Sequence, residues 1–469
     1  MAARLSTIVS HLKNDEKSLA FMGKTAVVHD IMQELDVSVA KLNQIIVHFI
    51  TAMMLGLKKA KGPELKMLPS FVYNGATDVT GSYLALDLGG TNFRVIYVRL
   101  ENGKLAGEAQ VDKFAIPAEL MHTAATGDML FDFIALSVAQ FLEKHAVDNA
   151  PSGFTFSFPV QQTEIDSGRL LNWTKGFSTQ NTVGKDVVAL LRAAFARASV
   201  KVSVRALVND TVGTLVAGYF ADRTSEVGVI IGTGSNACYW EAVPQITKLP
   251  SPSGWSGGSE RMCVNMEWGN FDSEKRCVLP TTEMDRQVDD MSPNAGSQRL
   301  EKMVSGMYLG EIGRLILLRL IRHGILPTVP SHVPPMSLTS AHLSCVLADG
   351  SPDLGATRRL FHDLYRYELS VEEAAVIKML FTAVATRSAR LSAGGVAAIL
   401  LKTGRVRDVQ VCIDGSVFEK MPGYKQVMEE ALDAVMKSHG IEDPNIRLVH
   451  TDGGSGLGAA FIAALASRK

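Results

Sequence analysis

Apolar and polar positions divide the chain into short strands and long helices. Residues 83–88 are an apolar run typical of a buried strand, residues 89–92 ("GGTN") are typical of a tight turn, and residues 93–100 are typical of a returning strand. A third strand is expected near 109–116, and a helical pattern at 30–57 precedes the hairpin. The pattern therefore predicts a helix followed by three strands that begin with a hairpin.

The remainder of the first half alternates between the helical period and the strand period. The expected order is helix, strand, helix, strand, helix, at residues 128–145, 153–158, 184–198, 202–208 and 210–220.

The second half repeats this order. Strands are expected at residues 227–231, 236–242 and 262–266, helical stretches at 298–323 and 371–400, and then a strand, helix, strand and helix at 409–413, 417–438, 447–450 and 456–466. Residues 327–353 are rich in Pro, Ser and His and are expected to form an irregular surface excursion. The duplication predicts an α/β protein of two lobes, at 29–222 and 223–469, with a ligand cleft between the strand ends.

The composition of the chain limits the functions and binding partners that can be expected. The 469 residues are 46% hydrophobic and 20% charged, with a formal net charge of −1, so no global field favours nucleic acid or an anionic membrane. The five cysteines are scattered and odd in number, which argues against a disulfide framework or structural zinc. No apolar run reaches the roughly 18 residues of a membrane span, so none is expected.

The N-terminal segment 1–28 contains "RLSTIVSHL", which resembles the type 2 peroxisomal targeting signal. On a helix the leucines Leu5 and Leu12 share an apolar stripe, and Arg4 and His11 flank it. The resemblance implies recognition of residues 4–12 by a peroxisomal import receptor and residence in a peroxisome-like organelle such as the glycosome. The alternative is an amphipathic segment that docks on its own domain in a cytoplasmic protein.

Each half carries a glycine-rich turn, "DLGGTN" at 87–92 and "IGTGSN" at 231–236. A phosphate-binding turn needs backbone N–H groups close to the anion, and glycine allows that approach because it has no Cβ. Hydroxyl donors, a cation and a carboxylate that can hold a metal ion accompany these glycines. A single such turn would equally fit a hairpin with a capping Asp, but two at corresponding positions favour phosphate binding.

The ordered motifs "DLGGTNFR", "FTFSFP", "NWTKGF", "LVNDTVG", "GTGSNACYWE", "NMEWG" and "MYLGE" resemble those of the hexokinase family from about residue 68 to the C-terminus. Each motif occurs once, so the resemblance implies a single catalytic unit. It also implies the duplicated actin-like ATPase (ribonuclease H-like) fold and ATP-dependent phosphorylation of a hexose at its 6-hydroxyl, the first step of glycolysis.

The resemblance further implies a sugar site of hydroxyl-binding side chains, with Asp210 as general base and Lys175 as a second catalytic residue. Carboxylates and amides suit this task because a hexose presents a ring of hydroxyls, each a donor and an acceptor. Considered alone, an Asp after Asn at a strand end is equally typical of a helix cap. The implied sugar-binding residues are Ser157, Thr174, Lys175, Asn209, Asp210, Asn236, Glu267, Gln298 and Glu301.

On the nucleotide side, the family resemblance implies Mg-ATP held between the two turns, with Asp87 binding magnesium directly or through water. "DGSVF" and "TDGGSGLGAAF" resemble the adenosine-binding stretches. The chain departs from the family pattern at Gly453 and Leu457, where an acidic residue and a Lys are common, so the base contacts are open. The implied nucleotide-binding residues are Asp87, Gly89, Gly90, Thr91, Asn92, Arg94, Gly232, Thr233, Gly415, Ser416, Gly454 and Ser455.

Two other functions compete with this interpretation. The repressor-type bacterial glucokinase family shares the ATPase core, but its members typically carry a Cys-rich zinc-binding pattern that this chain lacks. A catalytically silent sugar sensor or an actin-like structural ATPase would have no need of the complete set Asp87, Lys175 and Asp210. The sequence leaves open the hexose range, feedback inhibitors and the oligomeric state, a homo-oligomer included.

Overall fold

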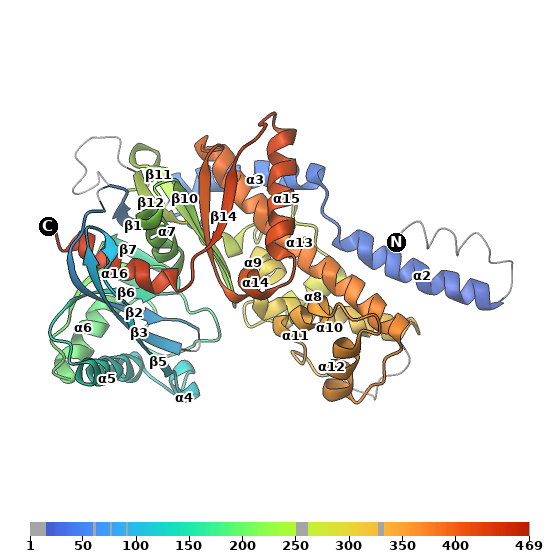
Figure 1. Cartoon of the computed structure of the whole chain (residues 1–469), viewed down its shortest axis with the longest axis horizontal. Helices are drawn as coiled ribbons and strands as arrows, with labels where there is room; N and C mark the ends of the chain where they lie inside the picture. The colour runs from blue at the N-terminus through green and yellow to red at the C-terminus, as the bar shows by residue number, and fades with distance from the viewer. Residues whose placement is uncertain are drawn as a thin grey trace.

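Two lobes, each built on a mixed β-sheet, lie side by side in the computed structural model (Figure 1). The model describes residues 16–59, 62–75, 77–90, 92–249, 261–326 and 333–468, with only the backbone for 16–24. The predicted targeting residues 4–12 and the predicted phosphate ligand Thr91 lie outside the described residues.

The sheet of the first lobe has the strand order β4-β3-β2-β6-β9, with β5 also paired to β3. Helices α5 (Gly127–His145) and α6 (Val187–Arg197) cover one face, and their apolar residues share a core cluster with β2 and β6. Short elements α4 (Ala118–Met121), β7 (Val160–Glu164) and β8 (Ser167–Leu170) border it. The strands are β2 (Gly81–Leu88), β3 (Asn92–Glu101), β4 (Lys104–Leu105), β5 (Gln110–Ala115), β6 (Pro151–Phe156) and β9 (Ser203–Val208).

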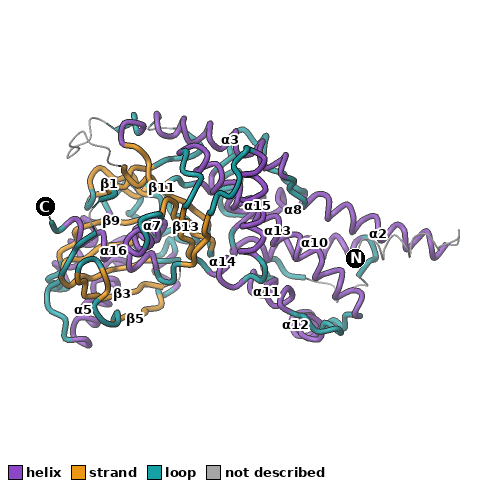
Figure 2. Tube along the Cα trace, turned by 45° about the horizontal axis from the view of Figure 1, so that its top comes forward, coloured by secondary structure: helices purple, strands orange, loops and turns teal. Residues whose placement is uncertain are grey.

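The sheet of the second lobe has the order β1-β12-β11-β10-β13-β14. One face packs against α7 (Asp210–Ala221), and the other contributes to the largest core cluster, which it shares with the helices of this lobe (Figure 2). The strands are β1 (Leu68–Tyr73), β10 (Ser225–Ile231), β11 (Ser235–Ala242), β12 (Arg261–Asn265), β13 (Val409–Asp414) and β14 (Ile446–His450). The helices are α2 (Glu16–Leu35), α3 (Val39–Lys58), η1 (Val243–Gln245), η2 (Trp268–Asn270), α8 (Glu283–Met291), α9 (Arg299–Val304), α10 (Gly306–Arg322), α11 (Ser340–Ala348), α12 (Gly355–Tyr365), α13 (Val371–Thr403), α14 (Ser416–Lys420) and α15 (Tyr424–Ser438).

The two sheets have corresponding topologies. In the first lobe β5, β3 and β2 pair antiparallel and β2, β6 and β9 pair parallel. In the second lobe β12, β11 and β10 pair antiparallel and β10, β13 and β14 pair parallel. The predicted duplicated actin-like ATPase fold is therefore confirmed.

Some elements pack in the lobe that lies on the other side of the predicted boundary at residue 222. Helix α16 (Gly454–Ala466), from the end of the chain, packs on β2, β6 and β9 of the first lobe, whereas β1 and α3 belong to the second lobe. Helices α7 and α16 cross in close contact. A Cβ on Gly458 would lie only 1.9 Å from the carbonyl oxygen of Gly213, so only a residue without a Cβ fits at this position. Glycines at this crossing bring the starts of both helices into the cleft.

Three stretches predicted as single helices are each two helices. Residues 30–57 divide between α2 and α3, where Ser38 accepts a hydrogen bond from the Lys41 N–H as an N-cap. Residues 298–323 break at Ser305, which ends α9 and precedes α10, and residues 417–438 break before Gly423, whose φ is 76°. The predicted irregular stretch 327–353 contains helix α11. Caps and left-handed glycines override the apolar periodicity here.

Residues Thr25–Lys58 are long and apolar enough to cross a membrane by length and composition alone. In the structure this stretch is divided between α2 and α3, and one face of α3 is buried against α13 and α15. Ile45, Phe49 and Met53 on that face belong to the main core cluster. Their apolar character is therefore accounted for by packing within the second lobe.

Candidate functional site

All nine residues predicted to bind sugar line one pocket between the lobes. The first lobe contributes hydroxyl, amide and charged groups from the ends of β6 and β9 and from the loop between β8 and α6. The second lobe contributes two amides and two carboxylates, from β11, from α9 and from the residues that immediately precede η2 and α9. The nine are Ser157, Thr174, Lys175, Asn209, Asp210, Asn236, Glu267, Gln298 and Glu301, and Phe158, Pro159, Ile230, Gly234 and Ser235 complete the lining.

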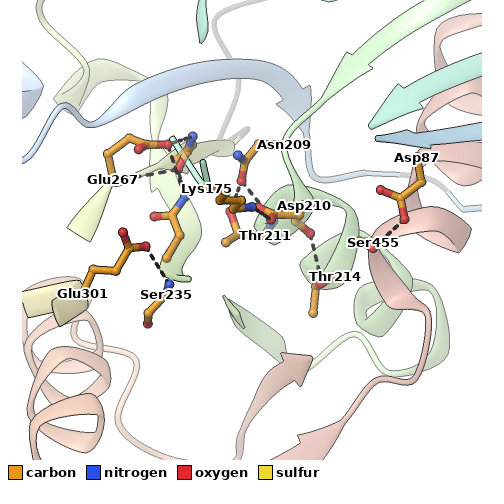
Figure 3. Close-up of polar contacts among 12 residues, drawn as sticks. Asp87, Lys175, Asn209, Asp210, Thr211, Thr214, Ser235, Glu267, Glu301 and Ser455 are labelled. Carbon is orange, nitrogen blue, oxygen red and sulfur yellow. Dashed lines mark hydrogen bonds and ion pairs between the residues drawn. The ribbon is translucent and has the colours of Figure 1, made fainter. Parts of the chain in front are cut away.

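Asp210 and Lys175 form an ion pair in this pocket. The Lys175 Nζ lies 3.2 Å from Asp210 Oδ2, and both side chains are mostly buried (Figure 3). Burial by itself would lower the pKa of Lys175, but Asp210, Glu301 and Glu267 together raise it above its ordinary value. Lys175 therefore stays charged and supplies a fixed cation at the centre of the pocket.

The start of α7 presents Asp210 to the cleft. Asn209, not Asp210, is the N-cap, because its side-chain oxygen accepts hydrogen bonds from the Thr211 N–H at 3.0 Å and from the Thr211 hydroxyl at 2.6 Å. Asp210 Oδ1 also accepts from the Thr211 N–H, at 2.9 Å. The capping role that the sequence pattern left open thus belongs to its neighbour, and Asp210 Oδ2 remains directed at Lys175.

Asn265, Asn236 and Glu267 form a hydrogen-bonded network. Asn236 Nδ2 donates to Asn265 Oδ1 at 2.8 Å and to Glu267 Oε1 at 3.3 Å, and Asn265 Nδ2 donates to Glu267 Oε1 at 2.9 Å. Asn236 Oδ1 accepts from the backbone N–H groups of Ala237 and Trp268. The two donors and both acceptor positions of the Asn236 amide are thus used within the protein. Asn236 therefore positions Glu267 in addition to lining the pocket.

Glu301 lines the sugar pocket beside the second glycine-rich turn. Its Oε2 accepts the Ser235 N–H at 2.9 Å, and a Cβ on Gly234 would lie 2.7 Å from that same oxygen. Burial raises the pKa of Glu301 to about 7, although the Ser235 N–H and Lys175 oppose the shift. Glycine at 234 is therefore required for the close approach of the turn to this carboxyl group.

Three of the pocket residues have left-handed backbone conformations. Lys175 has φ 54°, Glu267 φ 56° and Gln298 φ 56°, values that cost a residue with a Cβ on the order of 1–3 kcal/mol each. The surrounding packing supports them: Trp268, next to Glu267, donates from Nε1 to the Ser235 hydroxyl at 3.0 Å and lies against Gly395 of α13. Strain of this kind concentrates where side chains must point in a particular direction.

The two glycine-rich turns approach Lys175 from both lobes. A Cβ on Gly90 would lie 3.8 Å from the Lys175 side chain, and one on Gly234 would lie 3.6 Å from Lys175 Cε. The second turn also lies against the "DGS" turn, since a Cβ on Gly415 would lie 2.7 Å from the Gly232 N. The N–H of Gly306, at the start of α10, donates to the Gly232 carbonyl at 2.8 Å. The predicted phosphate turns and Gly415 with Ser416 therefore form one region beside the sugar pocket.

Asp87 is buried at the end of β2, beside the start of α16. Arg94 donates to Asp87 Oδ2, and the Ser455 hydroxyl lies 3.4 Å from the same oxygen (Figure 3). Burial raises the pKa of Asp87, and the Arg94 guanidinium opposes that shift. A second buried carboxyl, Asp414, ends β13, and burial raises its pKa to about 6. Carboxyl groups of both lobes thus surround Arg94, whose pKa is raised first of all by Asp87.

The donor set around Asp87 fits a magnesium ion bound together with phosphates. Among the described residues, no group of three or more His, Cys, Asp or Glu side chains could hold a metal ion without other ligands. Magnesium in phosphate sites commonly uses one or two carboxylates and takes its other ligands from water and phosphate oxygens. Asp87 meets that requirement, because it lies beside the Ser455 hydroxyl and the start of α16 at Gly454.

Some residues of this region are absent from the sequence-based set. Asp414 lies in the quoted "DGSVF" motif, and its position after a parallel strand, which it shares with Asp210, is a signal that could have identified it. Asn265 is the first residue of the quoted "NMEWG" motif and ends β12, and this position is a signal that could have identified it. Ser235 is among the hydroxyl donors that the sequence indicates in the second turn, but its backbone N–H donates to Glu301, and a backbone donor carries no side-chain signal.

Comparisons with known proteins agree with this geometry. Two family models, both described as hexokinase, match residues 27–220 and 226–465. Hexokinase-2 of Candida albicans is 39% identical over 451 residues, 94% of this chain and 92% of that protein. Hexokinase-1 of Spinacia oleracea is 40% identical over 458 residues, 92% and 90% of the two chains. A solved hexokinase of Schistosoma mansoni complexed with glucose has a TM-score of 0.84 at 34% identity and covers 95% of this chain and 99% of its own.

Proposed function

We propose that this chain, which belongs to the hexokinase family and phosphorylates glucose with ATP, uses Asp210 as its general base. The observation that carries the proposal is the position of the carboxylate: it lines the pocket that contains the whole hydroxyl-binding set, beside the phosphate turns. Asp210 accepts the proton of the sugar 6-hydroxyl as that oxygen attacks the γ-phosphorus in line, and ADP leaves.

Lys175 supports the same step from the other side of the ion pair. Its ammonium group lies between the carboxylates of the pocket and the two turns, so it can balance negative charge on the transferred phosphoryl group while Asp210 takes up the proton. The Lys175 side chain reaches this position from a left-handed backbone conformation. The conformational energy of that backbone is offset by the packing of the surrounding fold.

Recognition of the hexose rests on groups that would be left unpaired by a missing or inverted hydroxyl. Glu267 and Glu301 offer acceptors from the second lobe, and Asn209, whose oxygen is used in capping, offers its Nδ2 from the first. A pocket that hydrogen-bonds a substrate hydroxyl rejects an analogue lacking it more strongly than an apolar pocket rejects a missing methylene. We expect glucose and related hexoses that share these hydroxyls to be substrates.

Mg-ATP would be held between the turns around Asp87 and Thr233. Magnesium, when bound, neutralises negative charge on the phosphates. Asp87 would hold the ion directly or through water, and Arg94, now paired with Asp87, would turn its guanidinium to the phosphates. The glycine turns offer backbone N–H groups, and closure of the two lobes over the sugar would exclude water as a competing phosphoryl acceptor.

A coupled assay of glucose-dependent ADP release, with the product identified as hexose 6-phosphate, tests this function. We expect ADP formation only when glucose, ATP and magnesium are present together. Glucose binding without ADP release would instead indicate a catalytically silent sugar sensor, and ADP release that ignores glucose would indicate a structural ATPase.

We also propose that residues 4–12 direct the protein to a peroxisome-like organelle. The support is the sequence pattern of Arg4, Leu5, His11 and Leu12 described above. The start of α2, which follows this segment, lies at one end of the molecule, away from the cleft (Figure 1). An import receptor bound at residues 4–12 would therefore leave the sugar pocket accessible.

Fluorescence localisation of two double variants tests the targeting proposal. Replacing Arg4 and His11 removes the polar flanks and should leave an active kinase in the cytoplasm, whereas import of this variant would refute the proposal. Truncating Leu5 and Leu12 instead tests the alternative of a docking helix, which expects unchanged localisation and lower stability.

A further inference from the structure

A second pocket lies on α8 and α9, next to the segment that carries two of the predicted sugar ligands. Its cavity of about 400 Å³ shares no lining residue with the sugar pocket. The chain segments that form it are the loop before α8, α8 itself and α9. The lining residues are Arg276, Cys277, Leu279, Thr281, Asp285, Arg286, Asp289, Arg299, Lys302 and Met303.

The charge of this pocket favours an anion. Four lining side chains are cationic and two, Asp285 and Asp289, are carboxylates. Both carboxylates already have a cationic partner: Arg387 of α13 binds Asp285 through two hydrogen bonds of 2.6 and 2.7 Å, and Lys302 lies 2.6 Å from Asp289. Lys302 thus offsets Asp289 within the pocket, and Arg299 is paired with Asp272 at 3.2 Å, so the positive charge that is open to a ligand lies at Arg276 and Arg286.

Arg276 is the cation best placed to meet a ligand. It is exposed, its Nε donates to the Ser273 carbonyl, and within the part of the chain that the structure describes it has no carboxylate at ion-pair distance. Arg286, also exposed, is paired only with Glu283 one turn away on α8, a contact of small energetic value. Two guanidinium groups at the rim can thus turn to a phosphoryl group, which guanidinium binds through two parallel hydrogen bonds.

The inner wall of the pocket is buried and polar. Lys302 is 3% exposed and donates to Asp289 Oδ1 and to the Asn294 carbonyl at 2.9 Å. Burial lowers the pKa of Lys302, and Asp289 opposes the shift. Asp289 also accepts the Gly296 N–H at 3.0 Å. A ligand with hydroxyl groups would find acceptors at Asp289 and at the Thr281 hydroxyl, whose oxygen also accepts from Arg299 at 2.5 Å.

The same contacts connect this pocket to the sugar site. Lys302 and Asp289 link α8, the loop at 292–298 and α9, and α9 places Glu301 in the sugar pocket and Lys302 in the second one. Gln298 immediately precedes α9 and has a left-handed backbone. A ligand hydroxyl that competes with Lys302 for Asp289 would therefore shift the segment that holds Gln298 and Glu301.

We infer that the pocket on α8 and α9 binds a small phosphate monoester carrying hydroxyl groups, and that its occupancy changes the affinity for hexose. The inference rests on the proposed function only in assigning Gln298 and Glu301 to the hexose. The phosphoryl group lies at Arg276 and Arg286, and the hydroxyl groups lie at Asp289 and Thr281. The site is separate from the phosphate turns of the cleft.

Calorimetry with glycerol 3-phosphate as the probe, without ATP or magnesium, tests binding directly. We expect binding by the native protein and by Gly90→Val, in which the cleft turn is blocked, and none with glycerol at equal concentration. The double variant Arg276→Ser with Arg286→Ser should bind at least ten-fold more weakly. The matched control, Arg359→Ser with Arg405→Ser, removes two exposed arginines elsewhere and should bind as the native protein does.

A fluorescence titration of glucose at saturating glycerol 3-phosphate tests the coupling. We expect a several-fold change in the glucose Kd of the native protein and no change in the Arg276 and Arg286 double variant. Binding that is lost in Gly90→Val, binding unaffected in the double variant, or a glucose Kd that ignores the saturated pocket would each overturn the inference. Failure of the proposed function would appear separately, as an absence of glucose turnover, with the calorimetric result still decisive for the pocket.

Discussion

On the sugar side of the cleft, buried polar side chains are hydrogen-bonded to one another within each lobe, as in the Lys175 and Asp210 pair of the first lobe and the network of Asn236, Asn265 and Glu267 in the second. On the phosphate side, the predicted ligands are mainly backbone groups of glycine turns, with Asp87 held by Arg94 in place of a ligand. The sugar pocket is therefore largely organised in the free protein, whereas the phosphate region must exchange an internal ion pair for Mg-ATP. The difference predicts that the two ligands can be uncoupled by substitution.

The largest effect is expected from Gly90→Val. Among the described residues other than its chain neighbours, a Cβ at this position would meet only the Lys175 side chain, at 3.8 Å, so the fold should tolerate the substitution. It would instead occupy the space of the phosphates and weaken ATP binding by about a hundred-fold or more, as several charge-assisted hydrogen bonds are lost. Calorimetry with ATP and with glucose measures both affinities.

Gly350→Val is the matched control, because that glycine also has open space around its Cβ position and lies away from the cleft. It should bind both ligands normally. Equal loss of ATP and glucose binding in Gly90→Val would show that the two sides are not independent.

A smaller effect is expected on the sugar side from Asn265→Ala. The substitution removes the shorter hydrogen bond of Asn236 and that of Glu267 and leaves only their mutual contact of 3.3 Å, at a cost of about 1–3 kcal/mol, or roughly thirty-fold in glucose Kd. ATP affinity should stay unchanged. Asn43→Ala, which removes an amide hydrogen-bonded to Ser438 on the surface, is the control for the glucose titration and for Tm. A native glucose Kd in Asn265→Ala would contradict the positioning role.

The smallest effect concerns pH. Because burial raises the pKa of Glu301 to about 7, this carboxyl group is protonated in the empty pocket below that pH and ionised above it. If the ionised form accepts the sugar hydroxyl, glucose affinity is full above pH 7 and falls about ten-fold as pH drops from about 8 to about 6. Glucose titrations of Glu301→Gln without nucleotide should show weaker binding with this pH dependence removed. Persistence of the same dependence would assign it to another group.

Sequence reasoning was most successful where side-chain chemistry follows a strand end. The nine sugar residues were identified by family motifs and lie in one pocket, and the turns at Gly90 and Gly234 both approach Lys175. The order of the motifs indicates which residue types the site requires and at which strand ends these residues lie. Their convergence follows from the duplicated topology, which the repeated strand and helix pattern predicted.

Other features depend on contacts between distant segments and have no local signal. The placement of α16 on the first lobe arises from packing between segments that are several hundred residues apart in the sequence. The left-handed conformations of Lys175 and Glu267 oppose local preference, so no propensity predicts them. The breaks at Ser38 and Ser305 are single-residue events inside apolar patterns that continue across them.

The most direct test of the account is the pair of values, kcat and glucose Kd, for Asp210→Ala. Asp210 is assigned to the step that joins the two sides of the cleft, so its loss should lower kcat by about a hundred-fold to ten-thousand-fold and leave the glucose Kd within a few-fold of native. A variant with near-native kcat, or one in which glucose binding is lost to the same extent as turnover, would contradict the assignment of Asp210 as the general base.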